Sequence, residues 1–409
     1  TAWRELESSF QRDSDHTPFN VFATANLQKQ RQFSQEFQAL GDSFDDTVHW
    51  VSGLYYFHED ASELTNVFMP DLRGYPIEGF FDHKASNKNW AVYGEVTFDL
   101  SEKTHLTIGA RYTDEHKHYS SYQVMRDSGQ SNQLIEVLMD EPGQSLRFRK
   151  FTTRATLAFD WNLNTKTYAT YSQGFKSGGF NSRHLTPSPN LRAIAYQPEY
   201  VSQYELGLKH TNADHTFRFN SALFYSDYAD IQISTNPSAT QTATITQNAA
   251  KASISGVELE FAMVPMAHWL IEANLGYLDA HYDKLDQQVN IDPNNAFAWT
   301  PEWSGSLTAS YTHPFKNGSI FDARFSANFK SDTEGTAENE TDVRQESYAL
   351  GNIQLGYRDE TDNWNAAINI DNITDRQYLI SANQNQAIGY AEGVYNRGRT
   401  WRLTLSRRF

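Results

Sequence analysis

The chain has 409 residues, of which 14% are aromatic and 21% charged, and its formal net charge is −16 at pH 7. This acidic balance argues against a nucleic-acid-binding protein, because such proteins present a basic surface. The absence of cysteine excludes disulfides and thiolate metal sites. No apolar run approaches the roughly 18 residues of a membrane-spanning helix, and mean hydropathy is −0.65.

Segments of alternating apolar and polar residues recur along the whole chain. Alternation with a period of two indicates strands with one apolar and one polar face. The predicted strands, about sixteen, are 1–12, 30–41, 47–59, 88–100, 104–118, 145–160, 164–174, 199–210, 214–227, 252–264, 268–280, 303–314, 318–330, 346–358, 362–372 and 399–409. Each is long enough for a tilted crossing of a bilayer, which takes about 9–11 residues.

Two kinds of connection alternate between these strands. Tight turns rich in Asn, Asp, Gly and Pro are predicted at 41–46, 100–104, 160–164, 210–214, 265–267, 314–318 and 358–362. Long polar stretches are predicted at 60–87, 119–144, 175–198, 228–251, 281–302 and 373–398. Short turns on one rim and long loops on the other are typical of outer-membrane β-barrels. A sandwich or propeller would not keep the two classes in rotation. We therefore predict an all-β, antiparallel, up-and-down transmembrane barrel.

The last segment, 399–409, gives the orientation of the strands. Trp401, Leu403 and Leu405 share one face, whereas Arg402 and Thr404 share the other, so the strand needs lipid or a core on one side. Phe409 resembles the terminal aromatic residue of bacterial outer-membrane barrels, which the barrel assembly machinery reads as a signal. This resemblance places Phe409 at the periplasmic rim, with the short turns in the periplasm and the long loops outside the cell.

Residues 171–181, Tyr-Ser-Gln-Gly-Phe-Lys-Ser-Gly-Gly-Phe-Asn, are the most specific stretch of the sequence. They closely resemble a strand-to-loop motif of TonB-dependent outer-membrane receptors. Further segments resemble the same family in the same order: 32–36, 50–57, 204–209, 254–260, 371–375, Tyr378 and Phe409. The resemblance covers nearly the whole chain.

Members of this family are plugged barrels of about 22 strands with an N-terminal plug domain and a TonB box. This sequence shows about sixteen strands, no plug, no TonB box and no signal peptide, and it starts at Thr1. We therefore expect residues 1–409 to be the barrel domain of a receptor whose plug and first strands lie upstream and are absent here.

The resemblance implies a receptor that imports a scarce nutrient, a ferric siderophore first of all, with energy supplied through TonB. The expected partners are TonB, the assembly machinery, lipid with lipopolysaccharide, and the small-molecule ligand. No cofactor and no covalent chemistry are expected. One alternative is a passive porin, because about sixteen strands also suit an open aqueous channel. A second is a barrel hydrolase, although the sequence shows no nucleophile beside a base.

Capture of an anionic iron chelate calls for arginine or lysine together with aromatic planes. The loops that the topology places outside the cell offer these candidates: Phe175, Lys176, Phe180, Asn181, Arg183, Trp299, Tyr378, Tyr390, Tyr395 and Arg397. The alternatives are that the arginines bind lipopolysaccharide phosphates or pair with acidic residues, and that Phe175, Lys176 and Phe180 pack the loop. Gly174, Gly178 and Gly179 are open to a purely conformational role.

His116 and His118, beside Asp114, are spaced so that both lie on one strand face. They could share a metal ion, but a metal site needs more ligands than this spacing supplies. Alternation continues the lipid-side face past Tyr112 to these histidines. We therefore expect them to face solvent or lipopolysaccharide, and we predict no metal site.

Overall fold

The structure is a computed structural model that describes residues 1–13, 22–69, 76–129, 133–182, 187–235, 244–286, 289, 291–385 and 390–408. Its main feature is one antiparallel sheet of 16 strands. The strands are β1 (Ala2–Asp13), β2 (Ala23–Ser43), β3 (Val48–Met69), β4 (Ile77–Ser101), β5 (Thr104–Asp127), β6 (Gln133–Asn162), β7 (Thr165–Lys176), β10 (Glu199–Thr211), β11 (Phe217–Thr235), β12 (Ile245–Met263), β13 (Trp269–Leu285), β14 (Trp303–Pro314), β15 (Ile320–Lys330), β16 (Tyr348–Arg358), β17 (Trp364–Asp371) and β20 (Thr400–Arg407).

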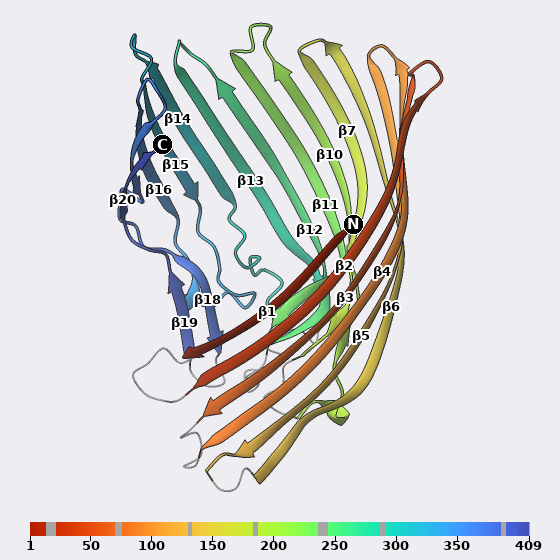
Figure 1. The fold of residues 1–409 in the computed structure, drawn as a ribbon. Coiled ribbons are helices and arrows are strands. Elements are labelled where there is room, and N and C mark those ends of the chain that lie inside the picture. The colour runs from red at the N-terminus through yellow and green to blue at the C-terminus, as the bar shows by residue number, and fades with distance from the viewer. Residues whose placement is uncertain are drawn as a thin grey trace.

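These strands wind obliquely around a curved wall (Figure 1). Each strand pairs with the next strand of the sheet along the chain, and β1 and β20 form the two edges. Two short hairpins lie outside the sheet: β8 (Gly179–Phe180) with β9 (Ala195–Tyr196), and β18 (Leu379–Asn385) with β19 (Tyr390–Tyr395). Every predicted strand is present, so the predicted all-β antiparallel fold is confirmed. In the described part of the chain, no helix is long and apolar enough to cross a membrane.

The short turns lie at one end of the wall, at the top of Figure 1. Between β2 and β3, three consecutive residues, Phe44, Asp45 and Asp46, have positive φ angles of 55° to 61°. Aspartate tolerates this left-handed region better than most residues do. Between β16 and β17, the Asp359 carboxylate accepts hydrogen bonds from Thr361 Oγ1 (2.7 Å) and Trp364 N (2.9 Å). Local side-chain chemistry therefore closes these turns, as the sequence predicts.

The opposite end of the wall differs from the prediction. The stretches 60–87 and 119–144, predicted as long loops, are mostly strand, because β3 and β4 pair from Val48 to Met69 and β5 and β6 reach Asp127 and Gln133. β6 alone has 30 residues, whereas a tilted crossing takes about 9–11. Beyond the lipid both faces of a strand tolerate polar side chains. The ladder of backbone hydrogen bonds therefore continues where the alternating sequence pattern fades.

Register assigns the two faces of the sheet. Tyr204 of β10 lies opposite Tyr171 of β7 and Tyr225 of β11, and Leu206 lies opposite Leu223 of β11. These side chains share one face, and large apolar side chains on that face stay exposed in the isolated chain. The same face carries Leu54, Trp90, Val92, Ile108, Phe151, Leu157, Leu275, Leu307, Phe325, Ile368, Trp401 and Leu403. Contact with lipid requires a wide apolar face that no other part of the protein covers. We call it the outer face.

Candidate functional site

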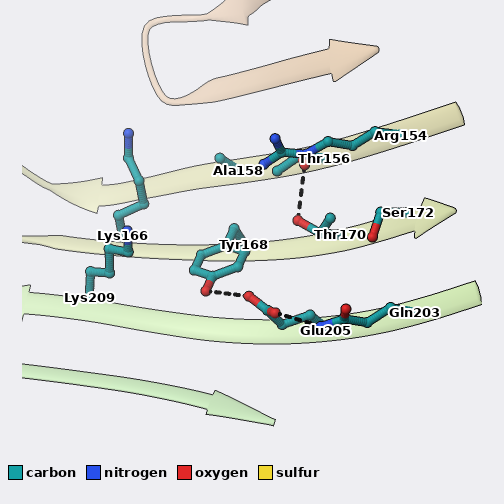
Figure 2. Close-up of a pocket in the computed structure, with 10 residues that line it drawn as sticks. All are labelled: Arg154, Thr156, Ala158, Lys166, Tyr168, Thr170, Ser172, Gln203, Glu205 and Lys209. Atoms are coloured by element: carbon teal, nitrogen blue, oxygen red, sulfur yellow. Dashed lines mark hydrogen bonds between the residues drawn. The ribbon is translucent and has the colours of Figure 1, made fainter. Parts of the chain in front are cut away.

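A pocket of about 520 Å³ lies on the opposite, inner face of β6, β7 and β10 (Figure 2). Three cationic side chains, Arg154, Lys166 and Lys209, line it. The Tyr168 hydroxyl donates a hydrogen bond to Glu205 Oε1 (2.7 Å), and Lys209 Nζ lies 5.7 Å from the centroid of the Tyr168 ring. Arg154 lies 3.9 Å from Glu95 and Lys166 lies 3.3 Å from Asp160, so the pocket is a polar surface in which cations, carboxylates and hydroxyl groups balance one another.

The Tyr168 ring keeps its place because the residue opposite it on β10 is Gly207. A Cβ atom at Gly207 would lie 2.2 Å from the ring. Tyr93 lies across Gly53 in the same way, with 2.4 Å between its ring and a Cβ built on the glycine. An aromatic ring laid over a glycine restores packing to a strand position that lacks a side chain. Each ring therefore fills the space above a glycine on the inner face of the sheet.

The long connections at the other end of the wall form a second candidate site. We call the described residues of 177–198, 230–248, 286–302, 331–347 and 373–398 the loop layer. These segments are joined to one another by amide side chains that bond to backbone atoms of another segment. An amide side chain has both a donor and an acceptor, so it can satisfy a backbone N–H and C=O at once.

Asn181 makes the most complete of these connections, and it is 7% exposed. Its Nδ2 donates to the carbonyl oxygen of Thr246 (2.8 Å), and its Oδ1 accepts from the Thr246 N–H (2.7 Å). The Asn181 N–H donates to Ile194 O (2.8 Å). Asn181 thereby joins β12 to the segment that follows β7.

Gln232 and Asn248 strengthen the same junction. Gln232 Nε2 donates to the carbonyl oxygens of Ser177 and Gln197, each at 3.0 Å. Asn248 Nδ2 donates to Gln197 O (2.7 Å), while the Gln197 N–H donates to Asn248 Oδ1 (2.6 Å). The segment after β7 is therefore fixed to both β11 and β12.

Asn339 joins the segments 286–302 and 331–347. The Ala296 N–H donates to Asn339 Oδ1 (2.7 Å), and Asn339 Nδ2 donates to Ala296 O (2.9 Å). Asn339 has a φ angle of 57°, in the left-handed region that asparagine tolerates. In addition, Phe297 stacks on Tyr282 of β13 with the ring centroids 4.2 Å apart. The amide bonds of Asn339 therefore hold these two segments together, and the ring stack holds the first of them to β13.

The last connection reaches the hairpin of β18 and β19. The Leu379 N–H donates to Gln345 Oε1 (2.6 Å). Tyr378 stacks on Tyr348 with centroids 4.4 Å apart and the rings 11° from parallel. The Tyr378 N–H also donates to Asn396 Oδ1 (2.8 Å). The loop layer is thus a chain of fixed contacts around the end of the wall.

Three of the predicted ligand residues have structural contacts instead of open positions. Phe180 stacks on Tyr119, with centroids 5.3 Å apart, and Asn181 and Tyr378 hold backbone or ring partners as described above. Phe175 pairs with Tyr200 in the unbroken ladder of β7 and β10, and alternation from Tyr171 places it on the outer face. Phe180 therefore packs against β5, whereas Phe175 belongs to the strand ladder and does not pack the loop.

Other predicted residues are open. Lys176, Tyr395 and Arg397 are exposed, and Trp299 is 37% exposed with its N–H bonded to Glu334 O (2.8 Å). The structure describes the backbone of Tyr390 in β19 and nothing of its side chain. Arg183 and the terminal Phe409 lie outside the described residues. The structure therefore presents Trp299, Tyr395 and Arg397 as accessible groups without bringing them into one pocket.

The glycines of the predicted motif differ in how closely their neighbours approach. A Cβ atom at Gly178 would lie 2.2 Å from Tyr196 O, whereas one at Gly174 would lie 3.1 Å from Val201 Cγ1. Backbone cannot yield as a side-chain tip can, so Gly178 is required for the close approach of the segment to Tyr196. This supports a conformational role for the motif.

Arginine side chains hold two carboxylates in and beside the loop layer. Glu141, 3% exposed, accepts from Arg192 Nη1 (3.0 Å) and the Ala193 N–H (3.4 Å). Arg344 lowers the pKa of the Asp332 carboxyl beside it by hydrogen bonding. Both acids are thereby committed to arginine partners. Within the residues that the structure describes, no group of three or more His, Asp and Glu side chains could hold a metal ion.

Sequence reasoning missed the amide connections of Asn181, Gln232, Asn248, Asn339 and Gln345. Asparagine and glutamine in polar stretches suit turns, solvent or ligands equally well, and the partners lie up to 65 residues away. Only a weak signal in the sequence could have indicated these connections: asparagine and glutamine recur in the long connections as well as in the tight turns.

Comparison with known proteins decides the family. The family model for the TonB dependent receptor-like β-barrel matches residues 2–373. The chain belongs to this family. Barrels of TonB-dependent receptors reside in the bacterial outer membrane, so the exposed outer face meets lipid there. The family consists of transport receptors.

Individual TonB-dependent receptors resemble the chain at low identity. Pesticin receptors of Yersinia enterocolitica and Yersinia pestis are 26% identical over 383 residues, covering 91% of this chain and 51% of each receptor. The ferric yersiniabactin uptake receptor of Yersinia pestis superimposes with a TM-score of 0.81 at 20% identity, covering 100% of this chain and 58% of that one. A ferric citrate transporter gives 0.67 at 16% identity, covering 100% and 58%. The structures show a shared fold, and the chain spans about half the length of the pesticin receptors.

Proposed function

We propose that this chain forms the barrel of an outer-membrane receptor that captures a ferric siderophore outside the cell and imports it with energy supplied through TonB. The observation that carries the proposal is the family match over residues 2–373. It is supported by the relatives, since receptors named for pesticin and for ferric-pyoverdine 358 align with 91% and 72% of the chain. The fixed loop layer supplies a rigid surface at the end of the wall where capture would occur.

Residues 1–409 act, in this proposal, as the barrel domain of a longer receptor. Support comes from the lengths of the relatives, because the alignment covers 51% of the pesticin receptors. The remainder leaves room for a plug, a TonB box and further strands. The polar inner pocket beside Tyr168 would face whatever fills the barrel. TonB would act on the plug and not on the residues described here.

Capture is proposed to use Trp299, Tyr395 and Arg397 of the loop layer, together with Lys176 at the end of β7, Arg183 and Tyr390. A guanidinium and aromatic planes suit the anionic charge and the organic rim of a ferric siderophore. No covalent step is proposed, so the protein would not act as an enzyme. The passive porin gains no support from the comparisons, although the sheet has 16 strands.

Binding of iron chelates to the full-length receptor tests the proposal. Outer membranes from cells that make it are titrated separately with ⁵⁵Fe-labelled yersiniabactin, pyoverdine and citrate. We expect saturable binding of at least one chelate. The double variant Arg183→Ala with Arg397→Ala should weaken that binding about tenfold or more, as expected for the loss of charge-assisted contacts.

A matched control removes two arginines from the opposite rim. Arg358 and Arg408 both lie near Asp362 at the turn between β16 and β17. Their joint replacement by alanine should leave chelate binding unchanged. Equal losses in the two double variants would refute capture by the loop layer, and absence of saturable binding for all three chelates would count against a siderophore as ligand.

A further inference from the structure

An aromatic band crosses the outer face of β2 to β6. Phe33 lies 6.3 Å from Tyr56, and Trp90 lies 5.5 Å from Tyr112, measured between ring centroids. Phe151 of β6 is paired with Tyr112 and is 58% exposed. Amphipathic aromatic rings gather where the apolar part of a bilayer meets its headgroups. This band therefore marks the outer membrane interface on these strands.

A row of basic side chains lies immediately beyond the band. Register places His58 opposite Lys88, Lys88 opposite His116, and His116 opposite Arg147. Alternation puts all four on the outer face, because Lys88 is two residues from Trp90 and His116 is four residues from Tyr112. Arg149 lies opposite Asp114, between this row and the band. Four adjacent strands thus present basic groups at the depth of lipid headgroups.

Most basic side chains elsewhere on this part of the outer face are already neutralised. Arg31 pairs with Glu5 (2.9 Å), and Lys84 lies 3.7 Å from Asp82. Within the row itself, His58 lies 3.1 Å from Asp60. Lys88, in contrast, is exposed and has no ion-pair partner among the described residues. The positive charge of Lys88 is therefore unbalanced in a chain whose net charge is −16.

Asp114 organises the two arginines of this group. It is 5% exposed and accepts from Arg147 Nε (2.8 Å) and Nη2 (2.7 Å), and from Arg149 Nε (3.1 Å). One carboxylate thus holds two guanidinium groups, which leaves one net positive charge. The guanidinium side chains remain 53% and 56% exposed, and their other N–H groups point to no recorded partner in the described chain. Fixed guanidinium groups with free donors are well suited to a phosphate.

We propose that Lys88, together with Arg147 and Arg149, which Asp114 holds opposite Trp90, forms a binding site for a phosphorylated headgroup of an outer-leaflet glycolipid. Lys88 and the arginine pair supply two net positive charges to the phosphate. His116 lies between them on β5 and can donate from its ring. The adjoining Val92, Tyr112 and Phe151 offer an apolar surface for the acyl chains. A free inorganic anion would interact with the same charged groups but would make no contact with this apolar surface.

The test uses the full-length receptor in detergent micelles and measures bound lipid by native mass spectrometry. The variant is Lys88→Gln with Arg149→Gln, which removes two charges while the two bonds from Arg147 to Asp114 remain. The probes are a bis-phosphorylated glucosamine disaccharide lipid, its dephosphorylated form and inorganic phosphate. Each basic residue near an anionic membrane surface contributes about 1 kcal/mol, and about 1.4 kcal/mol is tenfold. We therefore expect the phosphorylated lipid to bind about 30-fold more weakly to the variant.

Two controls keep the result interpretable. Arg154→Gln with Lys209→Gln removes the same charge from the inner face and should leave lipid binding unchanged. Lys88→Arg keeps the positive charge and should retain the binding of the parent protein, which shows that charge is what position 88 supplies. Equal affinity of the parent protein for phosphorylated and dephosphorylated lipid would overturn the proposal. Displacement of the lipid by millimolar inorganic phosphate, with equal binding of the free anion, would also overturn it.

Discussion

Asn181 and Thr246 are joined by two reciprocal hydrogen bonds, 2.8 and 2.7 Å long, between one amide side chain and one peptide backbone. The two residues are 65 positions apart, and one lies in the motif that follows β7 while the other lies in β12. Asn181 is predicted from the sequence to contact ligand. In the structure its side chain instead attaches the loop layer to β12.

Replacement of Asn181 by alanine should release the segment after β7. Both Thr246 backbone groups would lose their partner in a buried site, and an unsatisfied buried group costs about 1–3 kcal/mol. We expect faster amide hydrogen exchange at 177–182 and 244–248, with little change in β13 to β16. Lys176→Ala, at an exposed site whose side chain has no recorded contact in the described chain, is the control. Unchanged exchange in both segments for Asn181→Ala would mean that the bonds do not hold the loop.

Gly178→Ala should be more damaging than alanine at most strand glycines. The added Cβ would meet Tyr196 O at 2.2 Å, whereas at Gly94 it would meet Val51 O at 3.6 Å. Forcing extra atoms into a packed site typically costs about 1–3 kcal/mol. Thermal unfolding of the two variants measures this difference. Equal unfolding midpoints in the two variants would show that the segment containing Gly178 can shift away from Tyr196 without a loss of stability.

An arginine introduced in the middle of the sheet tests whether the outer face contacts lipid. Leu275 of β13 lies on the outer face opposite Gly305, while Thr308 of β14 lies on the inner face opposite Glu272. Arginine at a lipid-facing midplane position destabilises a barrel by about 2–4 kcal/mol. Leu275→Arg should show that loss in urea unfolding from lipid vesicles, and Thr308→Arg should be much milder. Similar losses would reverse the assignment of the faces.

Tyr119 gives a prediction at alkaline pH. It lies in the part of β5 beyond the membrane, 5% exposed, and burial raises its pKa to about 12, above the usual value of about 10. A raised pKa means that the folded state holds its proton while the unfolded state loses it. The stabilisation is complete below about pH 10 and is lost towards pH 12. Tyr119→Phe should therefore have a flatter free energy of unfolding between these pH values, and an unchanged slope would argue against burial of the hydroxyl.

Much of the wall is predictable from sequence because lipid imposes a strict alternation. Tyr204 and Leu206 flank Glu205, and that spacing alone assigns the faces of β10. The extensions of β3 to β6 escape this reasoning, since outside the lipid Lys84 and His83 can occupy opposite faces of β4 without a hydrophobic signal. The site is less predictable for a related reason. Phe175 belongs to the motif, but the ladder carries it to the outer face, and the sequence does not state how far β7 continues.

Energised import by the full-length receptor distinguishes a TonB-dependent receptor from a passive channel. Cells that make it are supplied with the ⁵⁵Fe-labelled chelate that binds best, and uptake is followed over time with and without TonB and with and without a proton-motive-force uncoupler. We expect saturable accumulation that requires both TonB and the proton-motive force. Uptake that rises linearly with chelate concentration and is indifferent to TonB would contradict it, because that is how an open diffusion channel behaves.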